Sequence, residues 1–313
     1  MDKEQELWKV FPLNLRRVLS SMNIEFERLQ EIRLRVREPL LIIYDNREFF
    51  VGENGRLNTC MNDIYTVTPE DIRNTLDFIS RYSLYAYEDE IRQGFITIQG
   101  GHRVGIAGKV VMENNGIKTI RHISFLNIRL SHQIRDCGRE LLHLIGDEQG
   151  VRHTLIISPP RCGKTTLLRD LIRLLSDGTE ERAGVTVGVV DERSEIGACY
   201  QGVPQNDLGR RTDILDCCPK AYGMLMLIRS MSPVVVAVDE IGSREDIEAI
   251  EYVINAGCTI LATVHGNSIE DIRNKPVLRR LVEERIFERY VVLNNKGGIG
   301  HIERIFDAQG NGL

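Results

Sequence analysis

Apolar and polar residues alternate over short stretches of the first 135 residues. In the clearest example, Ile32, Leu34 and Val36 alternate with Arg33, Arg35 and Arg37, which is the period-two pattern of a half-buried β-strand. Similar short apolar segments separated by turns predict six further strands, at residues 40–44, 49–51, 95–99, 104–107, 110–113 and 117–120. We therefore expect residues 1–135 to form a small α+β domain with mainly antiparallel strands.

Two local signals refine this domain. Thr68 is followed by Pro69 and, three residues after the threonine, by Asp71, an arrangement typical of a helix start. It predicts a helix that runs to about Ser80. Residues 114–116, Asn-Asn-Gly, predict a hairpin turn between the last two strands.

The pattern changes between residues 136 and 150, which we interpret as a linker. A short helix is expected at 139–145, followed by a polar loop at 146–150. Beyond it, continuous apolar runs predict strands buried on both faces, as in a parallel sheet covered by helices. These runs are residues 153–157, 185–190, 234–238 and 259–264. Segments 290–293 and 302–306 predict a terminal hairpin at the sheet edge, so residues 151–313 are expected to form an α/β domain.

Composition excludes several classes of protein. The chain is 42% hydrophobic and 27% charged, enough apolar material for a core that needs no disulfides. The longest uncharged stretch, residues 252–269, is too polar for a membrane-spanning helix. The N-terminus lacks a basic segment followed by an apolar one, so no export signal is expected. The seven scattered cysteines then favour reduced thiols in the cytoplasm.

Charge argues against bulk attraction to nucleic acid. Residues 1–135 contain 19 basic and 18 acidic residues, and the remainder contains 21 and 27. Neither half has the basic excess of a domain that binds a duplex. Nucleic acid is therefore not expected as a partner, although this balance leaves room for local basic patches.

A phosphate-binding loop is the most specific signal. The run Ser158-Pro159-Pro160-Arg161-Cys162-Gly163-Lys164-Thr165, followed by Thr166, joins a predicted strand to a predicted helix. It matches the pattern G-x-x-x-x-G-K-[ST] with serine in place of the first glycine. Backbone N–H groups from Arg161 onward and the helix N-terminus would surround phosphates, Lys164 would compensate β/γ charge, and Thr165 would bind magnesium. The two prolines supply no N–H, so we expect a stiffened but competent loop.

Two acids end the apolar run at 234–238. Asp239 and Glu240 follow it directly, about seventy residues after the loop. A carboxylate at the end of such a strand holds the magnesium and its water shell, and the next one deprotonates the attacking water. We therefore assign Asp239 to the metal and Glu240 to the general base.

Two further segments are expected at the same edge of a parallel sheet, where ligands bind. Asp191-Glu192-Arg193-Ser194-Glu195 follows one predicted strand, and Glu192 is a candidate to position the metal or the water. A solvated loop with internal ion pairs is an equally good interpretation. His265 ends the next strand and is a candidate sensor of the γ-phosphate, with a purely structural histidine as the alternative.

These four segments, in this order, resemble the secretion-ATPase superfamily of type II and type IV secretion and pilus-retraction motors. Residues 191–195 resemble its Asp box, 232–244 its Walker B region and 255–268 its His box. The resemblance implies a RecA-like core that binds ATP and Mg²⁺ and assembles into a homo-oligomeric ring, a hexamer. Ser158 departs from the pattern, as does Asp239 where these ATPases usually have glycine.

A narrower resemblance covers nearly the whole chain. The runs at 82–90 (YSLYAYEDE), 100–105 (GGHRVG) and 208–213 (LGRRTD) are similar to the stage III sporulation AA family of endospore-forming bacteria. It implies a cytoplasmic ATPase of the mother cell that energises a secretion-like complex joining mother cell and forespore. Because no membrane-spanning segment is expected, contact with the membrane would run through protein partners of that complex.

The superfamily resemblance also implies that arginines reach the nucleotide. Arg103 and Arg121 best match the arginines of the N-terminal domain, and Arg129 matches them less closely. Arg210 and Arg211 are candidates to reach a neighbour's nucleotide. Ordinary surface arginines are the alternative for each.

Two rival functions remain open at this stage. A nucleic-acid-remodelling ATPase would use the same core and a basic strip formed by Arg33, Arg35 and Arg37. A nucleotide-binding scaffold without turnover would fit the altered loop at Ser158, Pro159 and Pro160.

Overall fold

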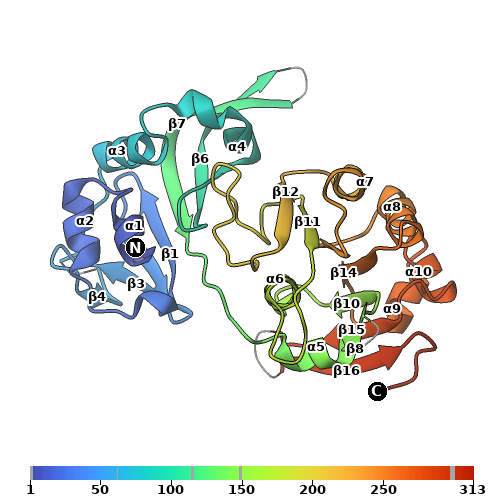
Figure 1. Ribbon diagram of the computed structural model, residues 1–313. Coiled ribbons are helices and arrows are strands. Elements are labelled where there is room, and N and C mark those ends of the chain that lie inside the picture. The colour runs from blue at the N-terminus through green and yellow to red at the C-terminus, as the bar shows by residue number, and fades with distance from the viewer. Residues whose placement is uncertain (1–2, 62, 114–115, 148–149, 297–299) are drawn as a thin grey trace. The chain divides into compact units, whose positions relative to one another are not determined.

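The computed structural model describes residues 3–61, 63–113, 116–147, 150–296 and 300–313. The chain divides into two compact units, Met1–His132 and Gln133–Leu313 (Figure 1). The expected turn at 114–116 lies partly outside the described residues. None of the described helices is long and apolar enough to cross a membrane.

The first unit is built on an antiparallel sheet in the order β4-β3-β2-β1-β7-β6-β5. Its strands are β1 Leu29–Arg35, β2 Leu41–Tyr44, β3 Arg47–Val51, β4 Leu57–Asn58, β5 Phe95–Thr97, β6 Arg103–Glu113 and β7 Gly116–Arg129. Its α-helices are α1 Lys3–Trp8, α2 Leu13–Ser20, α3 Pro69–Ile79 and α4 Glu88–Gln93, with short 3₁₀ turns at Phe26–Arg28 and Leu84–Tyr87. The expected α+β unit with antiparallel strands is confirmed.

Local sequence explains much of this unit. Ile32 and Leu34 of β1 are fully buried, as their alternation predicts. Thr68 caps α3 by accepting a hydrogen bond from the Asp71 amide, while the Asp71 carboxylate accepts one from the Thr68 amide. The two strands expected at 104–107 and 110–113 are one strand, β6, with a bulge at Gly108. A Cβ at Gly108 would lie 2.7 Å from the Arg121 carbonyl oxygen, so the bulge needs glycine.

The second unit has a sheet in the order β12-β11-β13-β14-β10-β15-β16. Its strands are β10 Thr154–Ser158, β11 Val187–Asp191, β12 Thr212–Asp216, β13 Val235–Val238, β14 Thr259–His265, β15 Arg289–Leu293 and β16 Ile302–Asp307. All neighbours are parallel except β15 and β16, which form the expected antiparallel hairpin at the edge. The predicted parallel sheet is confirmed, and β12 is an additional edge strand.

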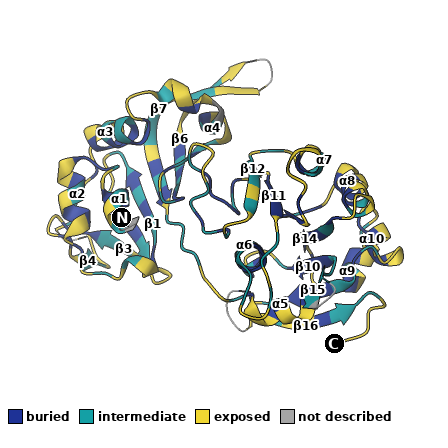
Figure 2. Ribbon diagram, in the orientation of Figure 1, coloured by how far each residue is buried: buried dark blue, intermediate teal, exposed yellow. Residues whose placement is uncertain are grey.

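Helices cover both faces of this sheet, and its inner strands β10, β11 and β13 are buried along their whole length (Figure 2). The helices are α5 Arg139–Ile145, α6 Lys164–Asp177, α7 Lys220–Met231, α8 Arg244–Asn255, α9 Ile269–Asn274 and α10 Arg279–Glu283. Apolar side chains of α5 and α6 share one core cluster with the sheet, and those of α7 to α10 share the other. The segment interpreted as a linker contains α5 and β8 Gly146–Asp147, which pairs with β9 Gly150–Val151. Its apolar residues Leu141, Leu142 and Ile145 lie in the core with α6, so it belongs to the second unit.

Candidate active site

The phosphate-binding loop joins β10 to α6. Ser158 is still part of β10, is fully buried and pairs with His265 of β14. Left-handed backbone occurs instead at Arg161, with φ 64°, and at Gly163, with φ 85°. The conformational freedom of glycine is therefore needed at Gly163, where α6 begins, and serine is accommodated at the position of the first glycine.

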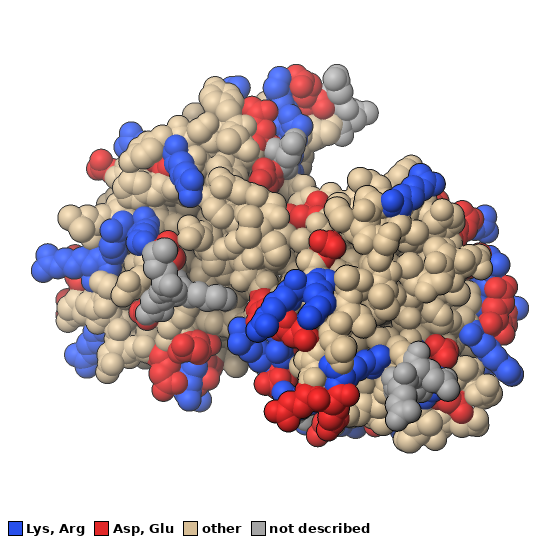
Figure 3. All heavy atoms as spheres, in the orientation of Figure 1, with Lys and Arg blue, Asp and Glu red and all other residues tan. Residues whose placement is uncertain are grey.

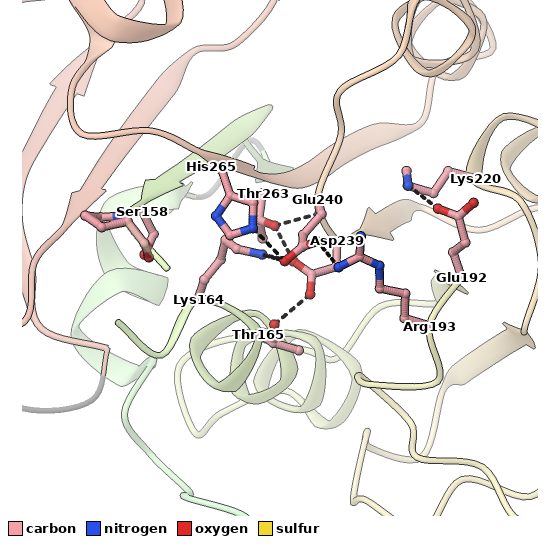
Figure 4. Close-up of polar contacts among 11 residues, drawn as sticks. Ser158, Lys164, Thr165, Glu192, Arg193, Lys220, Asp239, Glu240, Thr263 and His265 are labelled. Carbon is pink, nitrogen blue, oxygen red and sulfur yellow. Dashed lines mark hydrogen bonds and ion pairs between the residues drawn. The ribbon is translucent and has the colours of Figure 1, made fainter. Parts of the chain in front are cut away.

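Lys164 meets the two carboxylates that follow β13. Its Nζ lies 2.7 Å from Oδ1 of Asp239 and 3.1 Å from Oε1 of Glu240. Thr165 Oγ1 donates to Oδ2 of Asp239 over 2.6 Å (Figure 4). The structure therefore brings together four of the residues to which the sequence assigns chemistry.

Sheet topology explains this meeting. Strands β13, β14 and β10 are parallel neighbours, so their carboxyl ends lie at one edge. Val238 pairs with Ala262, one residue before Thr263, and Ser158 pairs with His265. The segments that follow these strands therefore converge although more than a hundred residues separate Ser158 from His265.

Buried polar contacts hold the two acids in place. The hydroxyl of Thr263, a fully buried residue, donates to Asp239 and accepts from the Glu240 amide over 2.9 Å. Glu240 has a left-handed backbone with φ 56°. A non-glycine residue in this conformation is costly and is retained where the surroundings enforce it. Thr263 is one part of that enforcement, because its hydroxyl holds the Glu240 amide.

Glu240 has two further neighbours, a histidine and an arginine. His265 Nε2 lies 2.9 Å from its Oε1, and Arg193 Nη1 lies 2.5 Å from its Oε2. Burial raises the pKa of Glu240, but hydrogen bonding and charge from Lys164 outweigh it and hold the pKa below the ordinary value. Burial also raises the pKa of Asp239, but Lys164 and the hydroxyls of Thr165 and Thr263 outweigh this effect. The pKa of Asp239 is therefore lowered as well. Both acids are therefore anionic at neutral pH.

The acidic loop at 191–195 divides into structural and site-facing residues. Asp191 is buried and accepts hydrogen bonds from the amides of Glu195, Ile196 and Gly197. Burial raises its pKa to about 6 in spite of these donors. Glu192 accepts from Lys220, and Figure 4 shows this pair to one side of Lys164. From this loop it is Arg193, to which the sequence assigned no role, that contacts Glu240.

Arg169 of α6 also holds this loop in place. The residue is 8% exposed, and it donates to the carbonyl oxygens of Ile196 over 2.9 Å and of Glu195 over 2.6 Å. Burial lowers its pKa from that of a solvated arginine, against the attraction of Asp191 and Asp239. The loop that carries Arg193 is thereby fastened to the helix that carries Lys164.

The arginines of the first unit lie on β6 and β7. The Arg103 guanidinium stands 4.1 Å from the centre of the Phe95 ring, a cation–π contact. Arg121 pairs across the strands with Lys109 and is exposed. Arg129 lies 3.5 Å from Glu31. Their approach to a nucleotide stays a prediction.

Thr263, Arg193 and Arg169 are the residues of the site that sequence reasoning missed. Each lay next to an assigned residue or within a recognised segment. Thr263 belongs to the strand that ends at His265, Arg193 follows Glu192, and Arg169 lies one helical turn beyond Thr165. Their roles depend on contacts between strands that the chain order does not reveal.

Comparison with known proteins matches this architecture. Residues 1–313 match the family described as Sporulation stage III, protein AA. The chain belongs to this family. It is 41% identical over 309 residues to stage III sporulation protein AA of Bacillus subtilis (strain 168), covering 98% of this chain and 96% of that one.

Solved structures show the fold at lower identity. The ATPase DotB of Legionella pneumophila is 15% identical with a TM-score of 0.53, covering 85% of this chain and 72% of that chain. The pilus retraction motor PilT, solved with bound ADP, is 13% identical with a TM-score of 0.57, covering 86% and 76%. The sporulation protein therefore shares the RecA-like fold of secretion and pilus ATPases.

Proposed function

We propose that this protein is a Mg²⁺-dependent ATP hydrolase. The observation that carries the proposal is the convergence of Lys164 and Thr165, at the start of α6, on Asp239 and Glu240, at the end of β13. One cation, one hydroxyl and two carboxylates at a helix N-terminus are the groups that nucleoside triphosphate hydrolysis requires.

The residues fit a magnesium nucleotide. The Thr165 hydroxyl and the Asp239 carboxylate, 2.6 Å apart, are hard oxygen donors of the kind that Mg²⁺ prefers. They would hold the ion, which neutralises phosphate charge when it is bound. Lys164 has three N–H donors and uses two on the carboxylates, which leaves one for a phosphate oxygen. The backbone amides from Arg161 to Thr166 would receive the remaining phosphate oxygens.

Glu240 is the proposed general base. It is anionic, and its two oxygens are oriented by Lys164, His265 and Arg193. In the proposed reaction a water oxygen bonds to the γ-phosphorus, its proton passes to Glu240, and the bond to the β–γ bridging oxygen breaks. Glu192 is at the rim of this site with Lys220, and His265 reports on the γ-phosphate through its contact with Glu240.

In the cell, we propose that the protein forms a homo-oligomeric ring, a hexamer, and acts as a motor. Its load would be a secretion-like or pilus-like complex between mother cell and forespore. Membership in the sporulation family and the fold shared with secretion and pilus ATPases support this proposal. The motor would lie in the mother-cell cytoplasm and reach the membrane through protein partners, with Arg103 and Arg121 linking movement of the first unit to turnover.

Nucleic acid is not a proposed partner. Arg33, one member of the suspected basic strip, lies 2.7 Å from Glu31. Basic and acidic side chains are intermixed on the face of the molecule that Figure 3 shows. This mixture supports docking to proteins over bulk attraction to polynucleotide.

The direct test is phosphate release by the purified protein with Mg²⁺ and ATP. Lys164→Ala should abolish turnover, and Glu240→Gln should lower kcat by about 10² to 10⁴ while it still binds ATP. Lys296→Ala, outside the described contacts of the site, is the matched control and should keep wild-type activity. Equal hydrolysis by the wild type and both site variants would refute the assignment.

A further inference from the structure

Glu240 offers a water one open position, and Arg193 stands beside it. We propose that Arg193 is a positioning residue that holds the attacking water at Oε2 of Glu240. This role rests on the proposed function, because it requires hydrolysis with Glu240 as the general base. Arg193 thereby takes the place of Glu192, which the sequence made a candidate to position the water.

The hydrogen bonds of Glu240 leave one oxygen open to a water. Each oxygen of a carboxylate accepts at about two lone-pair positions. At Oε1 these positions face Lys164 Nζ, 3.1 Å away, and His265 Nε2, 2.9 Å away. Oε2 has a single hydrogen bond to the described residues, from Arg193 Nη1 at 2.5 Å. A water that gives its proton to Glu240 therefore binds at Oε2, next to the guanidinium (Figure 4).

A hollow lined by Arg193 and Glu240 has the room of one water. It measures about 10 Å³, and a cavity of roughly 10 to 15 Å³ holds one water where polar groups can bind it. Every residue around the hollow carries a charged group: Asp191, Glu192, Arg193, Glu195, Lys220, Asp239 and Glu240. Such a lining retains a water, whereas an apolar cavity stays dry. The hollow is thus a site for the water that Glu240 activates.

Arg193 and Glu240 together fix the orientation of a water between them. An Nη atom of a guanidinium carries two N–H groups, so Arg193 Nη1 can donate both to Glu240 and to the water oxygen. The water donates one O–H to Oε2 of Glu240. Its second lone pair is then left for the γ-phosphorus of the substrate. Without Arg193 the water turns about its one remaining contact, and fewer of its orientations lead to attack.

The loop that carries Arg193 is held firmly enough to place a water. The Asp191 carboxylate accepts hydrogen bonds from the amides of residues 195–197. Arg169 donates to the carbonyl oxygens of two of these residues, and Ser194 has a left-handed backbone with φ 53°. The residue after Arg193 is therefore locked in a turn. Groups that position a reactant act best from such a preorganised element, because a displacement of about 1 Å can lower a rate by about 10²-fold.

Folding does not account for the contact between Arg193 and Glu240. The Arg193 side chain is 66% exposed, and an ion pair open to water contributes little to stability. Glu240 already has a buried cation in Lys164, whose side chain is 6% exposed. The charge of Glu240 is compensated without Arg193, so the added guanidinium has its use in the reaction.

Glu192 is less suited to position the water. Its carboxylate accepts a hydrogen bond from Lys220, and Figure 4 shows this pair apart from Glu240. A second carboxylate would also compete with Glu240 for the protons of the water, whereas a guanidinium donates to the water oxygen. The two neighbouring residues of the loop therefore differ in the end of the water that they can bind.

No bond to Arg193 forms or breaks in the step itself. The water oxygen bonds to the γ-phosphorus, its proton passes to Oε2 of Glu240, and the β–γ bridging oxygen leaves with the electron pair of the broken bond. Arg193 contacts the water and the base, and it is given no contact with ATP. Its loss should therefore act on kcat and leave the binding of ATP unchanged.

Arg193→Ala is the first test, with Arg229→Ala, a substitution of an exposed arginine on α7, as the matched control. With Mg²⁺ and ATP, Arg193→Ala should lower kcat by about 10²-fold, with KM for ATP near the wild-type value. Arg229→Ala should behave as the wild type. Arg193→Lys keeps a donor but loses the fork, so it should retain an intermediate kcat. Thermal unfolding should show that each variant keeps the fold.

Two further readouts distinguish positioning of the water from a structural role. Free guanidinium ion, at concentrations too low to denature the protein, should restore part of the kcat of Arg193→Ala, because the Arg193 side chain is open to solvent. It should not raise the kcat of Glu240→Gln. Arg193→Ala should also have little effect when Glu240 is already glutamine, since both changes act on one water.

The outcomes separate the role of Arg193 from the ATPase assignment. An unchanged or raised kcat in Arg193→Ala, or a change confined to KM, would overturn the role of Arg193 alone. So would a loss of kcat that neither lysine nor guanidinium restores, or one that multiplies with the loss in Glu240→Gln. A wild-type protein that binds ATP but releases no phosphate at any protein concentration would overturn the proposed function, and the role of Arg193 with it.

Discussion

The ammonium nitrogen of Lys164 lies 2.7 Å from Oδ1 of Asp239, although the two residues are 75 positions apart in the sequence. Their side chains are only 6% and 12% exposed, so each charge depends on the other for compensation. Glu240, 3.1 Å from the same nitrogen, shares the cation. The first prediction follows from this arrangement.

Lys164→Ala should destabilise the protein in the absence of nucleotide. The substitution leaves two adjacent carboxylates without their buried cation, and breaking a buried pair costs about 3 kcal/mol or more. Lys220→Ala is the matched control, because its partner Glu192 is 40% exposed and the expected loss is about 1 kcal/mol or less. Urea denaturation at pH 7 measures both free energies of unfolding. Equal losses would show that the Lys164 cluster is not a stabilising unit.

Glu240→Gln and His265→Ala should affect turnover through one carboxylate. Loss of a general base lowers kcat by about 10² to 10⁴. His265 lies 2.9 Å from Glu240, so its removal should lower kcat less and should have little effect when Glu240 is already glutamine. Single-turnover hydrolysis by the two variants and the double variant measures the coupling. If the losses of kcat in the two single variants multiply in the double variant, His265 does not act through Glu240.

Asp191→Asn should alter the dependence of stability on pH. The pKa of Asp191 is raised to about 6 by burial, above the value near 3.9 of an unfolded aspartate. The folded state thus binds the proton more tightly, and stability from this group is complete below about pH 3.9 and is lost as pH rises through 6. The contribution of this group to the free energy of unfolding should change by about 2 to 3 kcal/mol over this range. The difference in free energy of unfolding between variant and wild type should therefore vary between pH 4 and 7. A constant difference would contradict a raised pKa of Asp191 in the folded protein.

Gly209→Ala should displace the loop that carries Arg210. Its φ is 84°, and the new Cβ would stand 2.6 Å from the Ser176 Cβ and 2.9 Å from the Arg173 carbonyl oxygen. Gly310→Ala is the matched control, because φ is 86° but no atom lies within 4 Å. Both variants carry backbone strain, and Gly209→Ala should cost about 1 to 3 kcal/mol more because of the clash. Thermal unfolding measures the stability of both variants. Equal losses of stability would mean that the Gly209 contact with α6 yields without cost.

The two strands at the edges of the second sheet show where pattern reading succeeds and fails. The pattern predicts β16, because a turn-rich segment separates it from an apolar partner. β12 was missed because its sequence TDILD is mostly polar and its residues are only partly buried. An edge strand is held by backbone hydrogen bonds to one neighbour, and those leave little trace in the order of side chains.

The sequence by itself determined the features that depend on residues close together in the chain: the cap of α3 by Thr68 and Asp71, the loop from Ser158 to Lys164 and the two acids after β13. Only the tertiary structure decided which of these features meet. The register of β13, β14 and β10 sets Thr263 against Asp239 and His265 beside Glu240, and the anchoring of residues 207–211 to the end of α6 separates Arg210 from Arg211. Such contacts join residues tens to a hundred positions apart, and they are set by strand order and helix placement, which no local spacing encodes.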